Sequence, residues 1–306
     1  ARAHTSRDTI LFSGYHGWSD WYLAANLADN SNLDGQLMPG LSPAGVPRGL
    51  KGSAIPFNAN DLEDLQLKIK DKESNIAAII IEPARGIEPD PEYLKKLKEI
   101  SEEIGCVLIF DEITSGFRVC SGGIHRKYGI YPDIAVFAKS LANGYPMAAL
   151  IGVQKVMESA QSTFISSTNW TDRIGPVAAL ATIKKYNKLN VDKHIISIGE
   201  ACQAVWKKHA QENNLDITIS GLPALSAFNF NSDNASQLMT RFTTEMLQRG
   251  FLAWRQFKPS YAHKDLHINL YEAAIREVFK EIASIESDQI LQTPEAHSGF
   301  TRLTKE

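Results

Sequence analysis

Short runs of apolar, mostly β-branched residues alternate with longer stretches of helical periodicity through the first half of the chain. The runs predict strands at residues 9–12, 76–81, 106–110, 134–137 and 148–153. Apolar residues follow one another within these runs without polar alternation, which is typical of strands buried on both faces. Strands that alternate with helices build a parallel sheet covered by helices. We therefore expect an α/β fold with a mixed, mostly parallel sheet flanked by helices.

The clearest helix of the sequence spans residues 90–104, between the second and third predicted strands. Asp90 suits its N-cap and Pro91 its first turn, and Gly105 is placed to end it. Its apolar stripe consists of Leu94, Leu97, Ile100 and Ile104. This helix and its two neighbouring strands predict a βαβ unit.

The pattern changes in the second half, where helices at residues 175–185, 196–210, 236–249 and 265–284 surround short strands at 215–219 and 225–229. We place a large domain at residues 1–190 and a small C-terminal α+β domain at residues 191–306. A Gly/Pro-rich stretch at residues 39–52 predicts a long loop. The chain opens with Ala1 and Arg2, without Met or a helix cap, so we expect the N-terminal part of the large domain to be missing.

Composition and charge narrow the class of protein. With 32 basic and 35 acidic residues the formal charge is −3, which does not suggest a nucleic acid or an anionic membrane as partner. The three cysteines, Cys106, Cys120 and Cys202, form no CxxC pair and fit reduced thiols. No apolar run is long enough to cross a bilayer. We expect a cytoplasmic protein.

Two carboxylates, Asp111 and Glu112, directly follow the predicted strand at residues 106–110. Open α/β sheets bind ligands at the carboxyl ends of their strands. An ionised Asp beside a pyridine nitrogen keeps that nitrogen protonated, so that the ring can accept electrons from a carbanion. Taken alone, the pair is also compatible with capping or salt bridging after a strand, which is the more common role.

Lys139 lies just beyond the next predicted strand, at residues 134–137. A Schiff-base lysine needs a partly desolvated pocket in which its amine can be neutral and nucleophilic. Asn143 and Gly144 then predict a turn that returns the chain into the following strand. An isolated lysine at this place is more often a solvated charge, but its combination with Asp111 favours a cofactor site.

Three strings connect these residues to a known family: SGYHGWSDW at residues 13–21, FDEITSGFR at 110–118 and PDIAVFAKSLANGYPMAALIG at 132–152. Together they resemble the class III (fold type I) pyridoxal-phosphate-dependent aminotransferases, particularly the glutamate-1-semialdehyde aminomutase-like branch. The resemblance extends from about Ala1 to the AHSGFTRLT string at residues 296–304. It implies the fold type I architecture, pyridoxal 5′-phosphate as cofactor and a homodimer.

The resemblance also implies roles for four residues around the cofactor ring. Lys139 resembles the lysine that forms the Schiff base, and Asp111 the aspartate that pairs with the pyridinium nitrogen. Tyr15 resembles the aromatic residue that stacks on the ring, with His16 beside it. A flat aromatic face packs well against a flat heterocycle, although core packing of Tyr15 is equally compatible with the sequence.

Three further positions follow from the same resemblance. Thr114 stands at a cofactor-binding position where many members carry Gln. Glu82 resembles the glutamate on the substrate side of the site, while a capping carboxylate before Pro83 is an equally good interpretation. The hydroxyl-rich segment at residues 166–171 resembles one whose threonine contacts the cofactor phosphate across the dimer interface, with Thr168 preferred over Thr171.

A metal site is not expected. His263 and His267 have the spacing of two ligands on one helix, but no third ligand supports them. No GxGxxG or P-loop string occurs, which counts against a nucleotide-binding function.

The implied reaction moves an amino group between a small-molecule amino donor and a carbonyl acceptor. Lys139 would then take and return protons, and Asp111 would make the cofactor ring an electron sink. A glutamate-1-semialdehyde-type aminomutase and a racemase or epimerase are alternatives that the sequence does not separate. A truncated homologue without competent cofactor binding is the non-enzyme alternative.

Overall fold

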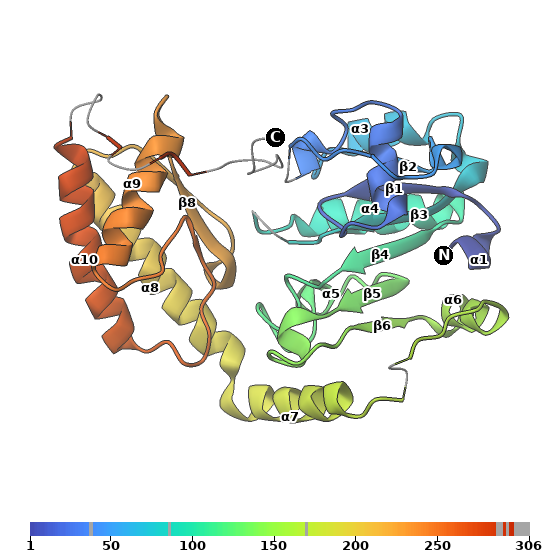
Figure 1. Cartoon of the computed structure of the whole chain (residues 1–306). Helices are drawn as coiled ribbons and strands as arrows, with labels where there is room; N and C mark the ends of the chain where they lie inside the picture. Colours follow the sequence, from blue (N-terminus) through green and yellow to red (C-terminus); the bar gives the residue numbers. More distant parts are fainter. Residues whose placement is uncertain (37–38, 85–86, 169–170, 286–289, 292–293, 297–306) are drawn as a thin grey trace. The chain divides into compact units, whose positions relative to one another are not determined.

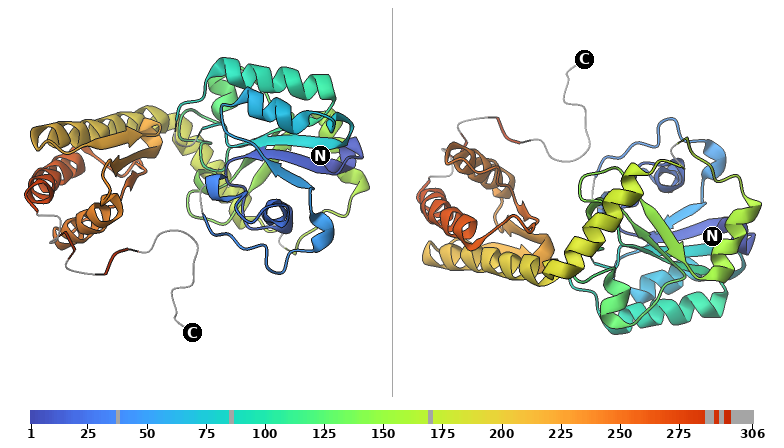
Figure 2. Two further views of the ribbon diagram at one scale, coloured as in Figure 1. Left: turned by 90° about the horizontal axis from the view of Figure 1, so that it is seen from above. Right: turned by 90° about the horizontal axis from the view of Figure 1, so that it is seen from below.

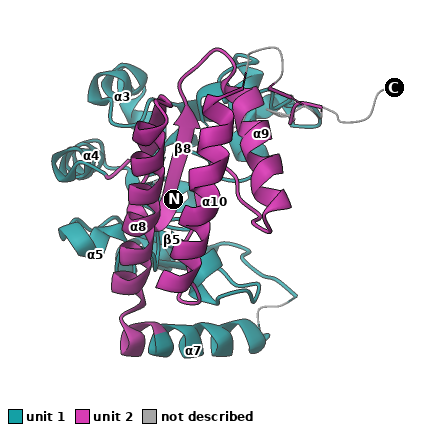
Figure 3. Cartoon of the chain, turned by 90° about the vertical axis from the view of Figure 1, so that its left-hand side faces the viewer, with its two compact units in different colours: residues 1–84, 89–185, 299–306 teal, residues 85–88, 186–298 magenta. Residues whose placement is uncertain are grey.

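The computed structural model describes residues 1–36, 39–84, 87–168, 171–285, 290–291 and 294–296. The chain forms two compact units (Figure 3), the first of which comprises Ala1–Ala84 and Pro89–Lys185. The second contains most of the described residues from Tyr186 onward. The border between the units lies inside helix α7 (Ile174–Leu189). The division into domains at residues 1–190 and 191–306 stays a prediction.

A six-stranded sheet forms the centre of the first unit (Figure 1), in the order β2-β1-β3-β4-β5-β6. Its strands are β1 (Thr9–Ser13), β2 (Ala54–Pro56), β3 (Ile76–Ile81), β4 (Val107–Asp111), β5 (Ile134–Phe137) and β6 (Ala149–Gly152). The first five are parallel, and β6 runs antiparallel to β5. The predicted mixed, mostly parallel sheet is therefore confirmed. Strand β2 was not predicted, because three residues are too short to show a pattern.

Helices cover this sheet and bury its apolar strands. They are α1 (Arg2–Thr5), α2 (Asp20–Leu23), α3 (Leu62–Ile69), α4 (Pro91–Ile104), α5 (Ile124–Tyr128), α6 (Gln154–Met157) and α7. Helices α3 and α4 lie over one face of the sheet (Figure 2). Tyr22 and Ala25 belong to the same buried cluster as Ile10 and Phe12 of β1. Both faces of the central strands are thus shielded from water, as their unbroken apolar runs predict.

Helix α4 begins and ends where its capping residues predict. The Asp90 carboxylate accepts a hydrogen bond from the Glu92 amide at 2.9 Å, and Gly105 ends the helix with a φ of 67°. A left-handed residue at this position favours glycine, which has no Cβ to clash. Single-turn 3₁₀ helices occur at Ala24–Leu27, Asp34–Gln36, Arg48–Leu50, Glu73–Asn75, Lys139–Leu141, Glu158–Ser162 and Pro223–Leu225.

The second unit packs α8 (Val191–Glu212), α9 (Ala235–Gln248) and α10 (Asp265–Ala283) around a small antiparallel sheet. The strands are β7 (Ile217–Ser220), β8 (Ser226–Phe230) and β9 (Gln256–Phe257), in that order. Buried aromatic rings of Trp206, Phe228, Phe242 and Phe279 fill its core. This α+β arrangement agrees with the predicted pattern. Among the described residues, none of the helices is long and apolar enough to cross a membrane.

Candidate active site

Most of the predicted site residues lie at the carboxyl ends of four neighbouring parallel strands of the first unit (Figure 1). Tyr15 and His16 follow β1, Glu82 follows β3, Asp111 is the last residue of β4, and Lys139 follows β5. Residues distant in sequence meet here because parallel strands end at the same edge of a sheet. Ligands of open α/β sheets bind at this edge.

The strongest polar contact at this edge joins Asp111 to His16. The Nδ1 atom of His16 lies 2.8 Å from Oδ2 of Asp111, and the two side chains are only 1% and 8% exposed. The other carboxylate oxygen of Asp111 accepts a hydrogen bond from the Ile113 amide at 3.1 Å. Asp111 is thus a buried, oriented carboxylate that pairs with His16 and caps the turn at Ile113.

His16 is held on both sides by hydrogen-bond acceptors. Its Nδ1 faces the Asp111 carboxylate, and its Nε2 lies 3.1 Å from the carbonyl oxygen of Ser13. Neither partner carries a hydrogen of its own, so both contacts are satisfied together when both ring nitrogens donate. The two contacts fix the orientation of the His16 ring beside Asp111. The rings of Phe12, Trp21 and Tyr22 pack around it.

Glu82 connects the ends of β3 and β1. Its Oε2 accepts a hydrogen bond from the Tyr15 amide at 2.9 Å. Gly14, with a φ of 102°, lets the carboxylate approach, because a Cβ at this position would lie 2.8 Å from Oε2. The carboxylate therefore fixes the backbone that carries Tyr15. The Tyr15 ring meets the rings of Trp18 and Tyr22 edge to face, each with its centroid 5.7 Å away.

Lys139 and Thr114 contact each other directly. The Nζ of Lys139 donates a hydrogen bond to Oγ1 of Thr114 at 2.8 Å, and Thr114 is buried. Lys139 has a φ of 46°, in the left-handed region that a lysine rarely occupies. Strained backbone of this kind is often found at functional sites. Lys139 as a whole residue is exposed, whereas its bond to Thr114 is partly buried, so the partly desolvated pocket stays a prediction.

Thr168 lies in a turn of the first unit and is exposed. Two neighbours in the same segment, Asn169 and Trp170, are outside the described residues. The phosphate contact of Thr168 therefore stays a prediction, and Thr171, which is also exposed, stays the second choice.

Three buried polar residues beside the site were not predicted. They are Glu112, Ser115 and His125, and they bond to one another. The sequence shows Glu112 next to Asp111, which is a signal that could have been followed. His125 lies in α5 and gives no sign of its partner, because the contact spans 13 residues.

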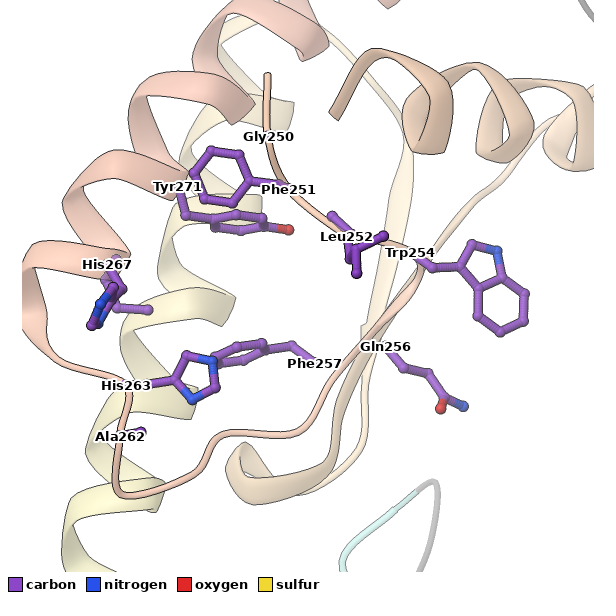
Figure 4. A pocket seen from close by; sticks show the side chains of 12 residues that line it. Gly250, Phe251, Leu252, Trp254, Gln256, Phe257, Ala262, His263, His267 and Tyr271 are labelled. Atoms are coloured by element: carbon purple, nitrogen blue, oxygen red, sulfur yellow. The ribbon is translucent and has the colours of Figure 1, made fainter. Parts of the chain in front are cut away.

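A cavity of about 420 Å³ lies within the second unit, and none of the predicted site residues line it (Figure 4). His263 and His267 are among its lining residues. His263 precedes α10 and His267 lies in it, so the two do not share a helix. Their Nδ1 atoms accept hydrogen bonds from the Ser260 and Lys264 amides at 3.0 Å and 2.9 Å. No cluster of three metal-ligating side chains occurs in the described part of the chain.

Comparison with known proteins identifies the family of this site. Residues 1–275 match the family described as "Aminotransferase class-III". The chain belongs to the class III aminotransferases. Its members use pyridoxal 5′-phosphate, and the predicted family, enzyme class and cofactor are thereby confirmed.

Two characterised relatives carry different names. The chain is 30% identical over 294 residues to the 3-aminobutyryl-CoA aminotransferase of Cloacimonas acidaminovorans, covering 92% of this chain and 67% of that protein. It is 32% identical over 301 residues to the glutamate-1-semialdehyde 2,1-aminomutase of Clostridium kluyveri, covering 90% of this chain and 70% of that protein. One relative is thus named an aminotransferase and the other an aminomutase.

Solved structures show the same fold. A structure of the "PLP internal aldimine form" of the Sphingopyxis sp. MTA144 FumI protein superposes with a TM-score of 0.81 at 24% identity, covering 93% of this chain and 68% of that one. An omega-transaminase from Sphaerobacter thermophilus gives a TM-score of 0.80 at 21% identity, covering 92% and 70%. The predicted fold type I architecture is confirmed.

The residues at the strand ends fit this cofactor. Asp111 offers a buried carboxylate whose orientation is fixed by His16 and Ile113, as a partner of a pyridinium nitrogen requires. Lys139 offers a primary amine on the neighbouring strand, and β4 and β5 are in register so that Asp111 lies opposite Val136. The donor chemistry of the site therefore agrees with the family's cofactor.

Proposed function

We propose that this chain transfers an amino group between a small-molecule amino donor and a carbonyl acceptor, with Asp111 and Lys139 as its catalytic residues. The observation that carries the proposal is the meeting of a buried, hydrogen-bonded carboxylate and an amine at the ends of adjacent strands β4 and β5. The family match supports the same reaction class.

Each residue has a task that follows from its chemistry. When bound, pyridoxal phosphate supplies an electron-poor ring that accepts the electrons left on a deprotonated substrate carbon. Asp111 holds a proton on the ring nitrogen, and His16 holds the Asp111 carboxylate in place. Lys139 binds the cofactor through Nζ and moves the proton between substrate atoms. Tyr15 packs against the ring, and Thr114 completes the cofactor contacts.

Two outer positions belong to the same proposal. Glu82 lies on the substrate side, where it also holds the Tyr15 amide. Thr168 binds the cofactor phosphate of a neighbouring subunit, for which an exposed hydroxyl is suited. The active unit is then a homodimer. The exposure of Lys139 supports this, because a second subunit would supply the desolvation that the described residues of one chain leave incomplete. We place the enzyme in the cytoplasm, a location supported by its free cysteines.

Intramolecular amino transfer is the second candidate. The 32% identity to a glutamate-1-semialdehyde aminomutase favours it. Both reactions use the same proton movements at Lys139 and differ in whether the intermediate product leaves. No observation favours a racemase or epimerase over these two reactions.

The test is to incubate purified, cofactor-loaded protein with single amino donors and follow the visible absorbance band of the cofactor. An aminotransferase loses the band with a donor alone and regains it with a keto acid or another carbonyl acceptor. An aminomutase converts glutamate-1-semialdehyde without any second substrate. A band that no amine disturbs would contradict both.

A further inference from the structure

A buried group of polar side chains lies directly behind the contact between Lys139 and Thr114. Glu112 is completely buried, Ser115 is 1% exposed and His125 is 7% exposed. Ser115 Oγ donates a hydrogen bond to Oε2 of Glu112 at 2.6 Å. The other oxygen, Oε1, lies 3.2 Å from His125 Nδ1 and 3.4 Å from the His125 amide nitrogen. Both oxygens of this buried carboxylate are therefore bonded.

The main chain around Glu112 is fixed as well. The Glu112 amide donates to the carbonyl oxygen of Val136 at 2.9 Å, which joins the end of β4 to β5. The Glu112 carbonyl oxygen accepts from the Gly116 amide at 2.7 Å and closes the turn that contains Thr114. A Cβ at Gly123 would collide with the Glu112 carboxylate, so glycine is needed there for close packing. The close approach of Gly123 and the bonds to Ser115 and His125 together hold the carboxylate in its position.

The same group contacts the strand that leads to Lys139. The His125 ring meets the Phe137 ring at a centroid distance of 6.1 Å, and Phe117 packs on Phe137 at 5.8 Å. Phe137 is the last residue of β5, two positions before Lys139. Glu112 thus bonds to the turn that contains Thr114. It also bonds to His125, whose ring packs on Phe137, two positions before Lys139.

We propose that Glu112, Ser115 and His125 form an anchor that holds the Thr114 hydroxyl against Lys139 Nζ, which makes Glu112 a positioning residue. The inference rests on the proposed role of Lys139, which it deepens. Thr114 accepts a hydrogen bond from the amine and so favours its charged form. The anchor acts on Lys139 through the position of that hydroxyl. Loss of the anchor therefore changes the labelling of the Lys139 amine in the same direction as loss of the Thr114 hydroxyl.

The experiment measures Lys139 in cofactor-free protein, where it can be labelled with acetic anhydride and quantified by peptide mass spectrometry across a pH series. Thr114→Val removes the acceptor directly. We expect its labelling profile to move to lower pH and its labelling rate at neutral pH to rise about threefold, as loss of one modest hydrogen bond predicts. Ser115→Ala and Glu112→Gln should move the labelling profile in the same direction. Thr114→Ser keeps the hydroxyl and should give the profile of the unmodified protein.

The controls separate positioning from general loss of stability. Ser101→Ala removes an equally buried hydroxyl, in α4, whose bond is to the Lys98 carbonyl. It should destabilise the fold without moving the Lys139 profile. The charged groups at the neighbouring strand ends, Asp111, His16 and Glu82, are unchanged in every variant. Ser115→Ala is the main variant, because it removes one hydroxyl and leaves the Glu112 bond to His125 in place, and its thermal unfolding is measured beside that of Ser101→Ala.

Two results would overturn the inference. One is a Ser115→Ala profile equal to that of the unmodified protein while Thr114→Val shifts it. The other is an additional shift when Ser115→Ala is added to Thr114→Val, since residues that act through one hydroxyl have no further effect once it is gone. Because no cofactor is present, these results are independent of whether Lys139 binds pyridoxal phosphate.

Discussion

Lys139 is the residue on which the proposed chemistry depends most. It follows β5 with a strained backbone and bonds to a buried hydroxyl. We expect borohydride reduction of the cofactor-loaded protein to attach the cofactor to the peptide that contains Lys139, as peptide mapping can determine. Lys139→Ala serves as the control, because it should remain unlabelled. Label on any other lysine of the unmodified protein would contradict the assignment.

Asp111 and His16 form a buried, hydrogen-bonded pair at the end of β4. Asp111→Asn leaves a neutral amide that does not hold a ring nitrogen protonated. We expect turnover to fall by roughly two to three decades, because loss of a charge-assisted partner costs about 2–4 kcal/mol of transition-state stabilisation. The measurement is kcat with a good amino donor.

The matched control for this change is Asp29→Asn, which alters an exposed aspartate away from the strand ends. Its turnover should equal that of the unmodified protein. Thermal unfolding of both variants shows whether the fold is kept. Near-normal turnover of a folded Asp111→Asn protein would mean that another group holds the ring nitrogen.

Helix α4 offers a test at the scale of one element. The Asp90 carboxylate caps its first turn, and Asp90→Ala leaves the Glu92 amide without that partner. We expect the free energy of unfolding to fall by about 1 kcal/mol, measured by urea denaturation. Because the exposed Asp90 carboxylate bonds to the Glu92 amide and not to a predicted site residue, turnover should not change.

Glu92→Ala is the control for the same helix, because it removes an acidic side chain from the first turn and leaves the cap intact. Its effect should be smaller, about 0.3–0.5 kcal/mol. Equal losses in both variants would show that charge rather than capping stabilises this helix end.

The predicted homodimer is tested at the scale of the whole molecule. Phe164 is 99% exposed and lies just before the hydroxyl segment that we assign to the subunit interface. The adjacent Ile165 is 59% exposed as well, and neighbouring exposed apolar side chains are typical of an interaction surface. We expect Phe164→Asp to give monomers with reduced cofactor content, as light scattering and absorbance can measure on one sample.

Leu67→Asp is the matched control, because Leu67 is 70% exposed on α3. This variant should remain dimeric and keep its cofactor. A Phe164→Asp protein that is dimeric and fully loaded would exclude this segment from the interface. An unmodified chain that is monomeric with one cofactor each would contradict the dimer itself.

The sequence alone determined the strands and helix ends, which depend on residues close together along the chain. Unbroken apolar runs specify β3 and β5, and the caps Asp90 and Gly105 specify α4, because strand burial and helix ends are local properties. Asp111 and Lys139 were found for the same reason, since each directly follows such a run and belongs to a family-like string. Even the turn at Asn143 is encoded locally.

Only the tertiary structure decided which side chains meet. His16 bonds to Asp111 across 95 positions, and Glu82 bonds to the Tyr15 amide across 67. Nothing in a local pattern encodes such contacts, because they arise when parallel strands bring their ends together. The solvent exposure of Lys139 and the bonds of Glu112 are decided in the same way. The sequence determines which functional group each residue carries, whereas the partners and the solvent exposure of that group depend on how the whole chain packs.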